Sequence, residues 1–173
     1  DPAQLARGWD VAALELSDDA PEPSAAALEQ DARRAEGAAM GVTGITQVEA
    51  SAGYGRRSMH LAQSNGFAGG YARTSRSFSA VAFTGEGTGM ERDWAAESRV
   101  FQSDLPAPEE AGRLAAERAL QRLGARKPRT GSYPVLYDER VASSLIGHLL
   151  SAANGSAIAR GASWARDLLG AQV

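Results

Sequence analysis

The sequence predicts an α+β fold in which an antiparallel β-meander packs against helices. Two segments, 24–41 and 107–124, carry apolar residues at helical spacing. The segment between them, 45–101, is rich in β-branched, aromatic and small residues that partly alternate, which is typical of strands. At 173 residues the chain is long enough to bury one core without a disulfide or a metal.

The first helix is predicted to follow the turn-rich stretch LSDDAPEPS (16–24). Ser24 is a suitable N-cap and Gly41 a plausible C-terminal stop, while Glu29 and Arg33 form an i,i+4 pair. One stripe of the helix carries its apolar residues, which are Leu28, Ala32, Ala35 and Ala39.

Four strands are predicted in the middle of the chain. The first three are ITQVEASAGY (45–54), RSMHLAQS (57–64) and FAGGYARTSRSFSAVAF (67–83). Asn65-Gly66 predicts a two-residue type I′ turn between the second and third strands, because both residue types tolerate positive φ. TGEGTGM (84–90) is expected to be a flexible loop, and ERDWAAESRVF (91–101) a fourth antiparallel strand.

The later part of the chain returns to helical spacing. Pro108, Glu109 and Glu110 suit a first turn, and Gly124 follows a stripe of Ala111, Ala115, Ala119 and Leu123. PVLY (134–137) is predicted to be a short strand, and Asp138 to cap a last helix. Its apolar stripe consists of Val141, Ala142, Leu145, Ile146, Leu149 and Ala153, of which Val141, Leu145, Ile146 and Leu149 are expected to anchor it to the sheet.

The composition excludes several classes of function. The net charge is −3 without a basic stripe, which argues against direct nucleic-acid binding. The absence of cysteine excludes a disulfide, a thiolate nucleophile and a cysteine zinc site. No apolar run is long enough to cross a membrane, and the first residues show neither the charged nor the apolar region of a signal peptide. Because the sequence lacks an initiator methionine, we expect it to be a piece of a longer protein.

Candidate chemical groups are few. GEGTG (85–89) could approach a phosphate, but its spacing matches neither a dinucleotide-binding fingerprint nor a P-loop, so a hairpin loop is favoured. His60 is interpreted as an ordinary strand residue that faces away from Met59 and Leu61. The carboxylate pairs 18–19 and 109–110 suit a turn and a helix N-terminus. No serine sits in a G-x-S-x-G elbow, which leaves little support for a serine hydrolase.

His148 lies just beyond the edge of the last helix's apolar stripe, near Ser144 and Ser151. A zinc helix needs two ligands one turn apart, whereas the positions four residues before and after His148 are serine and alanine. We therefore predict a structural histidine, and we assign no catalytic, cofactor-binding or metal-binding residue to this chain.

Three phrases together resemble one family: VEASAGYGRRSMHLAQSNGFAGGYARTS, GEGTGMERDW and YPVLYDERVASSLIGHLLSAANGSAIARGASW. They are similar to the PmbA (TldE) branch of the TldD/PmbA proteins, also described as microcin-processing peptidases and proposed modulators of DNA gyrase. The resemblance implies that 1–131 belong to the N-terminal domain of such a protein and that 132–173 lead toward its C-terminal domain.

The resemblance also implies a function. In this family a TldD-type and a PmbA-type subunit form a cytoplasmic heterodimer that degrades unstructured peptides, including peptide-antibiotic precursors and antitoxins. The zinc belongs to the TldD-type chain, whose H-E-x-x-x-H helix aligns its two histidines with Gly147 and Ala152 and its glutamate with His148. This chain is accordingly expected to be the subunit without metal.

Two other interpretations remain open. One is a non-enzymatic interaction protein that modulates DNA gyrase through a protein contact. The other is a self-sufficient peptidase that uses residues outside this segment.

Overall fold

The computed structural model describes residues 11–168 and 170, and the chain divides into two compact units, 1–126 and 127–173. The first unit contains η2 (Ala12–Leu14), α1 (Ala25–Met40), β1 (Ile45–Ala62), β2 (Ala68–Thr84), η3 (Gly87–Gly89), β3 (Glu91–Arg99), η4 (Gln102–Asp104) and α2 (Pro108–Gln121). The second contains α3 (Glu139–Ala152) and α4 (Gly155–Ala159). The domain identity expected for 1–131 and 132–173 stays a prediction.

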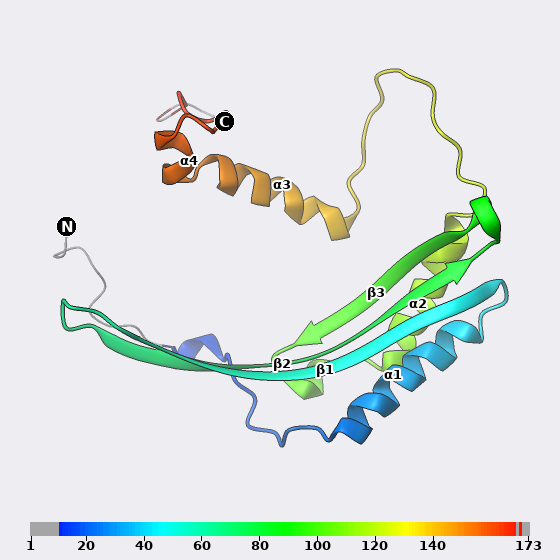
Figure 1. Cartoon of the computed structure of the whole chain (residues 1–173), viewed down its shortest axis with the longest axis horizontal. Helices are drawn as coiled ribbons and strands as arrows, with labels where there is room; N and C mark the ends of the chain where they lie inside the picture. The colour runs from blue at the N-terminus through cyan, green and yellow to red at the C-terminus, as the bar shows by residue number, and fades with distance from the viewer. Residues whose placement is uncertain (1–10, 169, 171–173) are drawn as a thin grey trace. The chain divides into compact units, whose positions relative to one another are not determined.

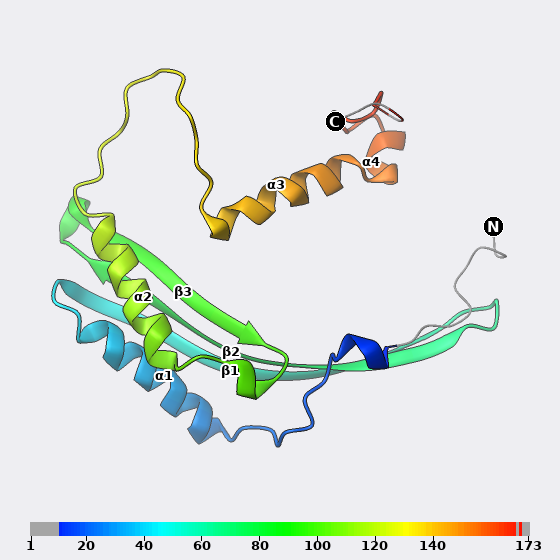
Figure 2. The same cartoon turned by 180° about the vertical axis from the view of Figure 1, so that it is seen from behind.

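The sheet is an antiparallel meander of order β1-β2-β3. Helices α1 and α2 lie side by side on one of its faces, as the two opposite views in Figures 1 and 2 show. The predicted α+β class is therefore confirmed.

The first two predicted strands, 45–54 and 57–64, are one strand. β1 pairs with β2 without a register shift from Gln47 to Ala62. Gly53 and Gly55 do not interrupt the ladder, because each stays paired with a serine of β2, Ser77 and Ser75. The sheet thus has three strands instead of the predicted four.

The hairpin at Asn65-Gly66 is present, but its turn type differs from the prediction. The Gly66 N–H donates to the Gln63 carbonyl at 3.1 Å, and the Gln63 N–H donates to the Phe67 carbonyl at 2.8 Å. Gly66 has φ of +86°, whereas Asn65 has a negative φ. Asn65 thus does not adopt the left-handed conformation that a type I′ turn needs. Its side chain accepts a hydrogen bond from the Phe67 N–H. This is a three-residue loop with glycine in the left-handed position.

The ends of α1 and α2 follow the sequence signals. Ser24 Oγ accepts from the Ala27 N–H at 3.2 Å, and α1 stops before Gly41. Pro108 opens α2, with Glu109 and Glu110 in its first turn. Leu123 was expected on the buried stripe, but α2 ends before it and its side chain is exposed, so that prediction is wrong.

The core between the sheet and the helices consists mainly of alanine. Its buried residues are Ala35, Ala39, Ile45, Phe78, Ala80, Ala82, Ala95, Ala111, Ala115, Ala116 and Ala119. Because alanine contributes only a methyl group, the helices lie close to each other and to the sheet. A methyl group on Gly112 of α2 would overlap the carbonyl oxygen of Ala35 in α1.

The second unit is a small helical segment. Asp138 caps α3 as predicted, with its side chain accepting from the Arg140 N–H at 2.9 Å. PVLY (134–137) forms no strand, because no neighbouring strand supplies ladder hydrogen bonds to it; that prediction is wrong. Val141, Leu145, Ile146 and Leu149 are all at least 41% exposed, and their expected anchoring to the sheet stays a prediction.

The close contact of α1 and α2 gives a matched test of stability. Gly112→Ala is expected to lower the free energy of unfolding by about 1–3 kcal/mol, because the added methyl group has to push the helices apart. Gly37→Ala, at a position in α1 with open space around it, is expected to raise it by about 0.5–1 kcal/mol through helix propensity. Urea unfolding of both variants measures this, and equal effects would contradict the packing described.

Candidate functional site

A buried polar network joins the segment before α1 to the end of the sheet. Asp18 is 8% exposed, and its carboxylate accepts from the Gln102 N–H and the Ala20 N–H, both at 2.8 Å. The Asp18 N–H donates to Thr74 Oγ1 at 2.7 Å, and that hydroxyl donates to the Val100 carbonyl at 3.2 Å. These hydrogen bonds fix the segment around Asp18 beside Thr74 of β2 and beside residues 100–102, which directly follow β3.

The same network perturbs the Asp18 carboxyl. The Gln102 N–H contributes most to lowering its pKa, and the Ala20 N–H contributes next, because both donate to the ionised form. Burial opposes this effect by penalising the charge. The carboxylate is thus kept ionised as an acceptor for the backbone, which suits a structural role better than acid catalysis.

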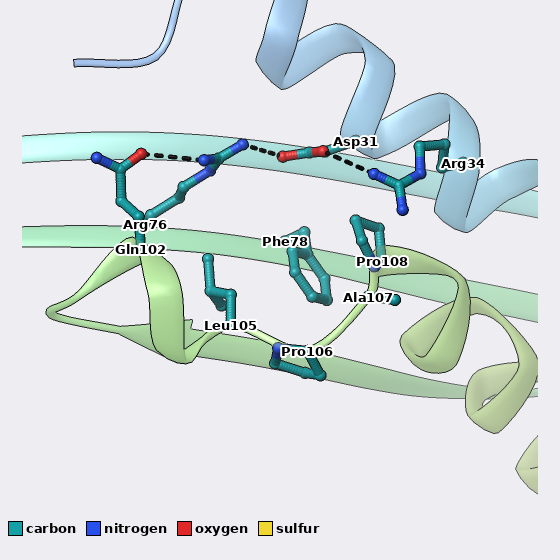
Figure 3. Close-up of a pocket in the computed structure, with 9 residues that line it drawn as sticks. All are labelled: Asp31, Arg34, Arg76, Phe78, Gln102, Leu105, Pro106, Ala107 and Pro108. Carbon is teal, nitrogen blue, oxygen red and sulfur yellow. Dashed lines mark hydrogen bonds and ion pairs between the residues drawn. The ribbon is translucent and has the colours of Figure 1, made fainter. Parts of the chain in front are cut away.

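A cavity of about 220 Å³ lies between α1, β2 and the segment that leads into α2. Its polar lining comes from Asp31, Arg34, Arg76 and Gln102, and its apolar wall from Phe78, Leu105, Pro106, Ala107 and Pro108. In Figure 3 the side chains of Gln102, Arg76, Asp31 and Arg34 form a row across its rim.

The arginines of this cavity are already paired with carboxylates. Arg76 donates to Asp31 at 2.5 Å and to Gln102 Oε1 at 3.0 Å. Arg34 makes two 2.8 Å hydrogen bonds to Glu109, which raise the pKa of Arg34 and lower that of Glu109. Arg76 Nε is buried and has no hydrogen-bond partner among the described residues. The cavity offers a hydrogen-bond donor, but no nucleophile or histidine lines it.

Sequence reasoning missed the partly buried pair of Asp31 and Arg76. Asp31 occupies the buried face of α1, between Leu28 and Ala35, so a charged residue within an apolar stripe was the available signal. Its partner lies 45 residues away on β2, and only the fold brings the two together.

Neither histidine lines the cavity, and the glycine loop does not line it either. His60 is exposed on β1 opposite Gly70, where a methyl group would overlap the imidazole and the Met59 carbonyl, so the ring lies across the glycine. GEGTG forms the connection from β2 to β3 through η3, as expected for a hairpin loop. His148 is exposed on α3, in the other unit.

The donor set on α3 does not fit zinc. Tetrahedral protein sites need three or four nitrogen, sulfur or oxygen ligands, and Ser144 uses its hydroxyl to donate to the Val141 carbonyl at 2.6 Å. Across residues 11–168 and 170, no group of three or more His, Cys, Asp or Glu side chains is placed to hold a metal. That this chain needs no zinc of its own stays a prediction.

The fold and sequence together define a class of protein. The PmbA/TldA metallopeptidase central domain matches residues 15–123, and the C-terminal domain of the same family matches residues 130–173. The chain therefore belongs to the PmbA/TldA metallopeptidase family. Within the described part of the chain, no helix is long and apolar enough to cross a membrane.

Individual relatives support this assignment. The chain is 38% identical over 110 residues to the metalloprotease PmbA of Escherichia coli O157:H7, which covers 64% of this chain and 24% of that protein. A proposed modulator of DNA gyrase from Bacteroides thetaiotaomicron has a TM-score of 0.88 and 29% identity, over 97% of this chain and 39% of its own. A similarly described protein from Thermotoga maritima shares the fold, with a TM-score of 0.76, 16% identity and 95% and 40% coverage.

The lowered pKa of Asp18 predicts a specific pH dependence. Its contribution to stability is fully present above the pKa of about 3.9 that it has in the unfolded chain, and it is lost as the pH falls through the lower folded pKa. Asp18→Asn is expected to melt below the wild type at pH 7, because an amide cannot accept both hydrogen bonds without presenting a donor to a donor. The difference in Tm between Asp18→Asn and the wild type should shrink toward pH 3.

Asp19→Asn is the matched control, because its side chain is exposed and makes no hydrogen bond among the described residues. Thermal melts of both variants at pH 7 and pH 3 make the comparison. A gap between Asp18→Asn and the wild type that is the same at both pH values would contradict the role assigned to Asp18.

Proposed function

We propose that this chain is part of the PmbA-type subunit of a two-subunit zinc metallopeptidase that degrades unstructured peptides in the cytoplasm. Its partner is a TldD-type subunit that holds the zinc, and its substrates include peptide-antibiotic precursors and antitoxins. Membership in the metallopeptidase family supports the reaction class. The chain spans about a quarter of the curated relative and two fifths of the solved structures, so the activity is assigned to the full-length complex.

One observation carries the proposed division of labour. On α3 the two positions that align with zinc-binding histidines of a TldD-type chain hold Gly147 and Ala152. Ala152 is only 6% exposed, and its carbonyl accepts a 2.5 Å hydrogen bond from Ser163 Oγ. An imidazole at this position would displace its neighbours, so the end of α3 around Ala152 leaves no room for a zinc-binding histidine.

The proposal predicts how activity depends on the partner. Full-length protein alone is expected to bind far less than one zinc per chain and to leave an unstructured peptide intact, whereas adding the TldD-type subunit restores cleavage. Elemental analysis and a peptidase assay on each protein and on the mixture measure this. Stoichiometric zinc and cleavage by the full-length protein alone would favour a self-sufficient peptidase instead.

His148 provides a sharper test within the complex. His148→Ala is expected to leave the zinc content and kcat/KM of the complex within about twofold of wild type. The reason is that Gly147 and Ala152 occupy the two positions of the zinc-binding histidines, so His148 has no bound zinc beside it. The matched control replaces the glutamate of the partner's H-E-x-x-x-H helix by glutamine, which should abolish cleavage. A large loss of activity in His148→Ala with normal assembly would show that the residue takes part in catalysis.

The alternative is a non-enzymatic protein that modulates DNA gyrase, as the descriptions of the two structural relatives suggest for those proteins. A pull-down with full-length protein separates the two functions. Recovery of gyrase without a TldD-type chain would replace the proposed function by this one.

A further inference from the structure

The hairpin of β1 and β2 continues beyond the three-stranded part of the sheet. β3 ends at Arg99, opposite Arg76, whereas β1 and β2 remain paired from Gly55 and Ser75 out to Ala62 and Ala68. We refer to residues 55–75 as the β-arm, which Figure 1 shows extending past the two helices. Every β1 position of the arm, 55–62, is exposed.

The β-arm carries positive charge that the described residues do not neutralise. No Asp or Glu occurs between Glu49 and Glu86, whereas Arg56, Arg57 and Arg73 lie on the arm. Arg57 and Arg73 are directly opposite each other on neighbouring strands. Neither Arg57, Arg73 nor Arg56 forms an ion pair with any residue described. Like charges at opposed positions destabilise a strand pair, so this arrangement costs stability in the isolated chain.

Apolar side chains accompany the arginines on the same face of the arm. Met59 and Leu61 alternate with His60 and follow Arg57 at every second position, so the three side chains project from one side of β1. Met59 is 42% and Leu61 44% exposed. Arginine combined with exposed methionine and aliphatic residues is typical of protein interfaces, and a ribbon of two strands is only marginally stable without a cover.

We propose that the β-arm docks onto an acidic surface of the TldD-type subunit, with Arg57 and Arg73 paired to its carboxylates and Met59 and Leu61 packed between the chains. This inference rests on the proposed function. The arm carries +3 and no acidic residue, whereas the whole chain has a net charge of −3. Apolar side chains next to the arginines on the same face fit a protein surface better than a phosphate backbone.

The test is the affinity of the full-length protein for its TldD-type partner. In the Arg57→Thr/Arg73→Thr variant, threonine suits a strand and removes the like-charge pair, so the Tm should not fall. The affinity is expected to fall by about tenfold or more. In the wild type, raising NaCl from 0.05 to about 0.5 M should weaken binding, because salt screens exposed charges. Calorimetric titration gives the affinities and thermal melts give Tm.

The matched control is Arg126→Thr/Arg129→Thr, which removes two exposed arginines from the segment between α2 and α3 and should leave the affinity unchanged. If the wild type does not bind a TldD-type chain, the proposed function fails and this inference fails with it. If the wild type binds and the arm variant binds equally well, only the inference fails.

Two further results would also overturn the inference. Light scattering that shows the wild type as a dimer and the arm variant as a monomer would assign the arm to a second copy of this chain. Arginine-dependent binding of a 20-base-pair DNA duplex at about 0.15 M salt, with partner affinity unchanged, would assign it to nucleic acid.

Discussion

The close contact between α1 and α2 is the constraint on which the first unit depends. Gly112 lies against the Ala35 carbonyl, and the surrounding core is built from alanine methyl groups with Phe78 and Ile45 as its larger members. A core of this kind buries little apolar area per residue, so its stability relies on tight packing. The polar contacts at its rim, above all Asp31 with Arg76, add fixed connections between α1 and the sheet.

The Asp18 and Thr74 network marks the border between two parts of the hairpin. On one side β2 has a strand on each edge, and on the other it belongs to the β-arm. Thr74 is fully buried there because residues 16–18 and Val100 both hydrogen-bond to it. The arm therefore begins where the last buried polar contacts of the body end, and Asp31 and Glu109 form their ion pairs with Arg34 and Arg76 of the body.

Local signals predicted most of the fold. Ser24, Pro108 and Asp138 marked helix starts because capping depends only on neighbouring residues. The unbroken β1 was missed because the segment that pairs with it along its whole length lies far away in sequence. PVLY has strand-like residues but no strand beside it. Of the candidate site, the structural role expected for His148 stays a prediction, whereas the pairing of Asp31 with Arg76 depends on the tertiary fold.

The unbroken register of β1 has a mechanical consequence. Between Gln47 and Ala62 no bulge interrupts its pairing with β2, so the arm and the body share one continuous hydrogen-bonded ribbon. A ribbon of this kind has no hinge at which the arm could swing freely. A force applied near Ala62 would therefore bend both strands along their length as far as Arg76, which is hydrogen-bonded to Asp31 of α1.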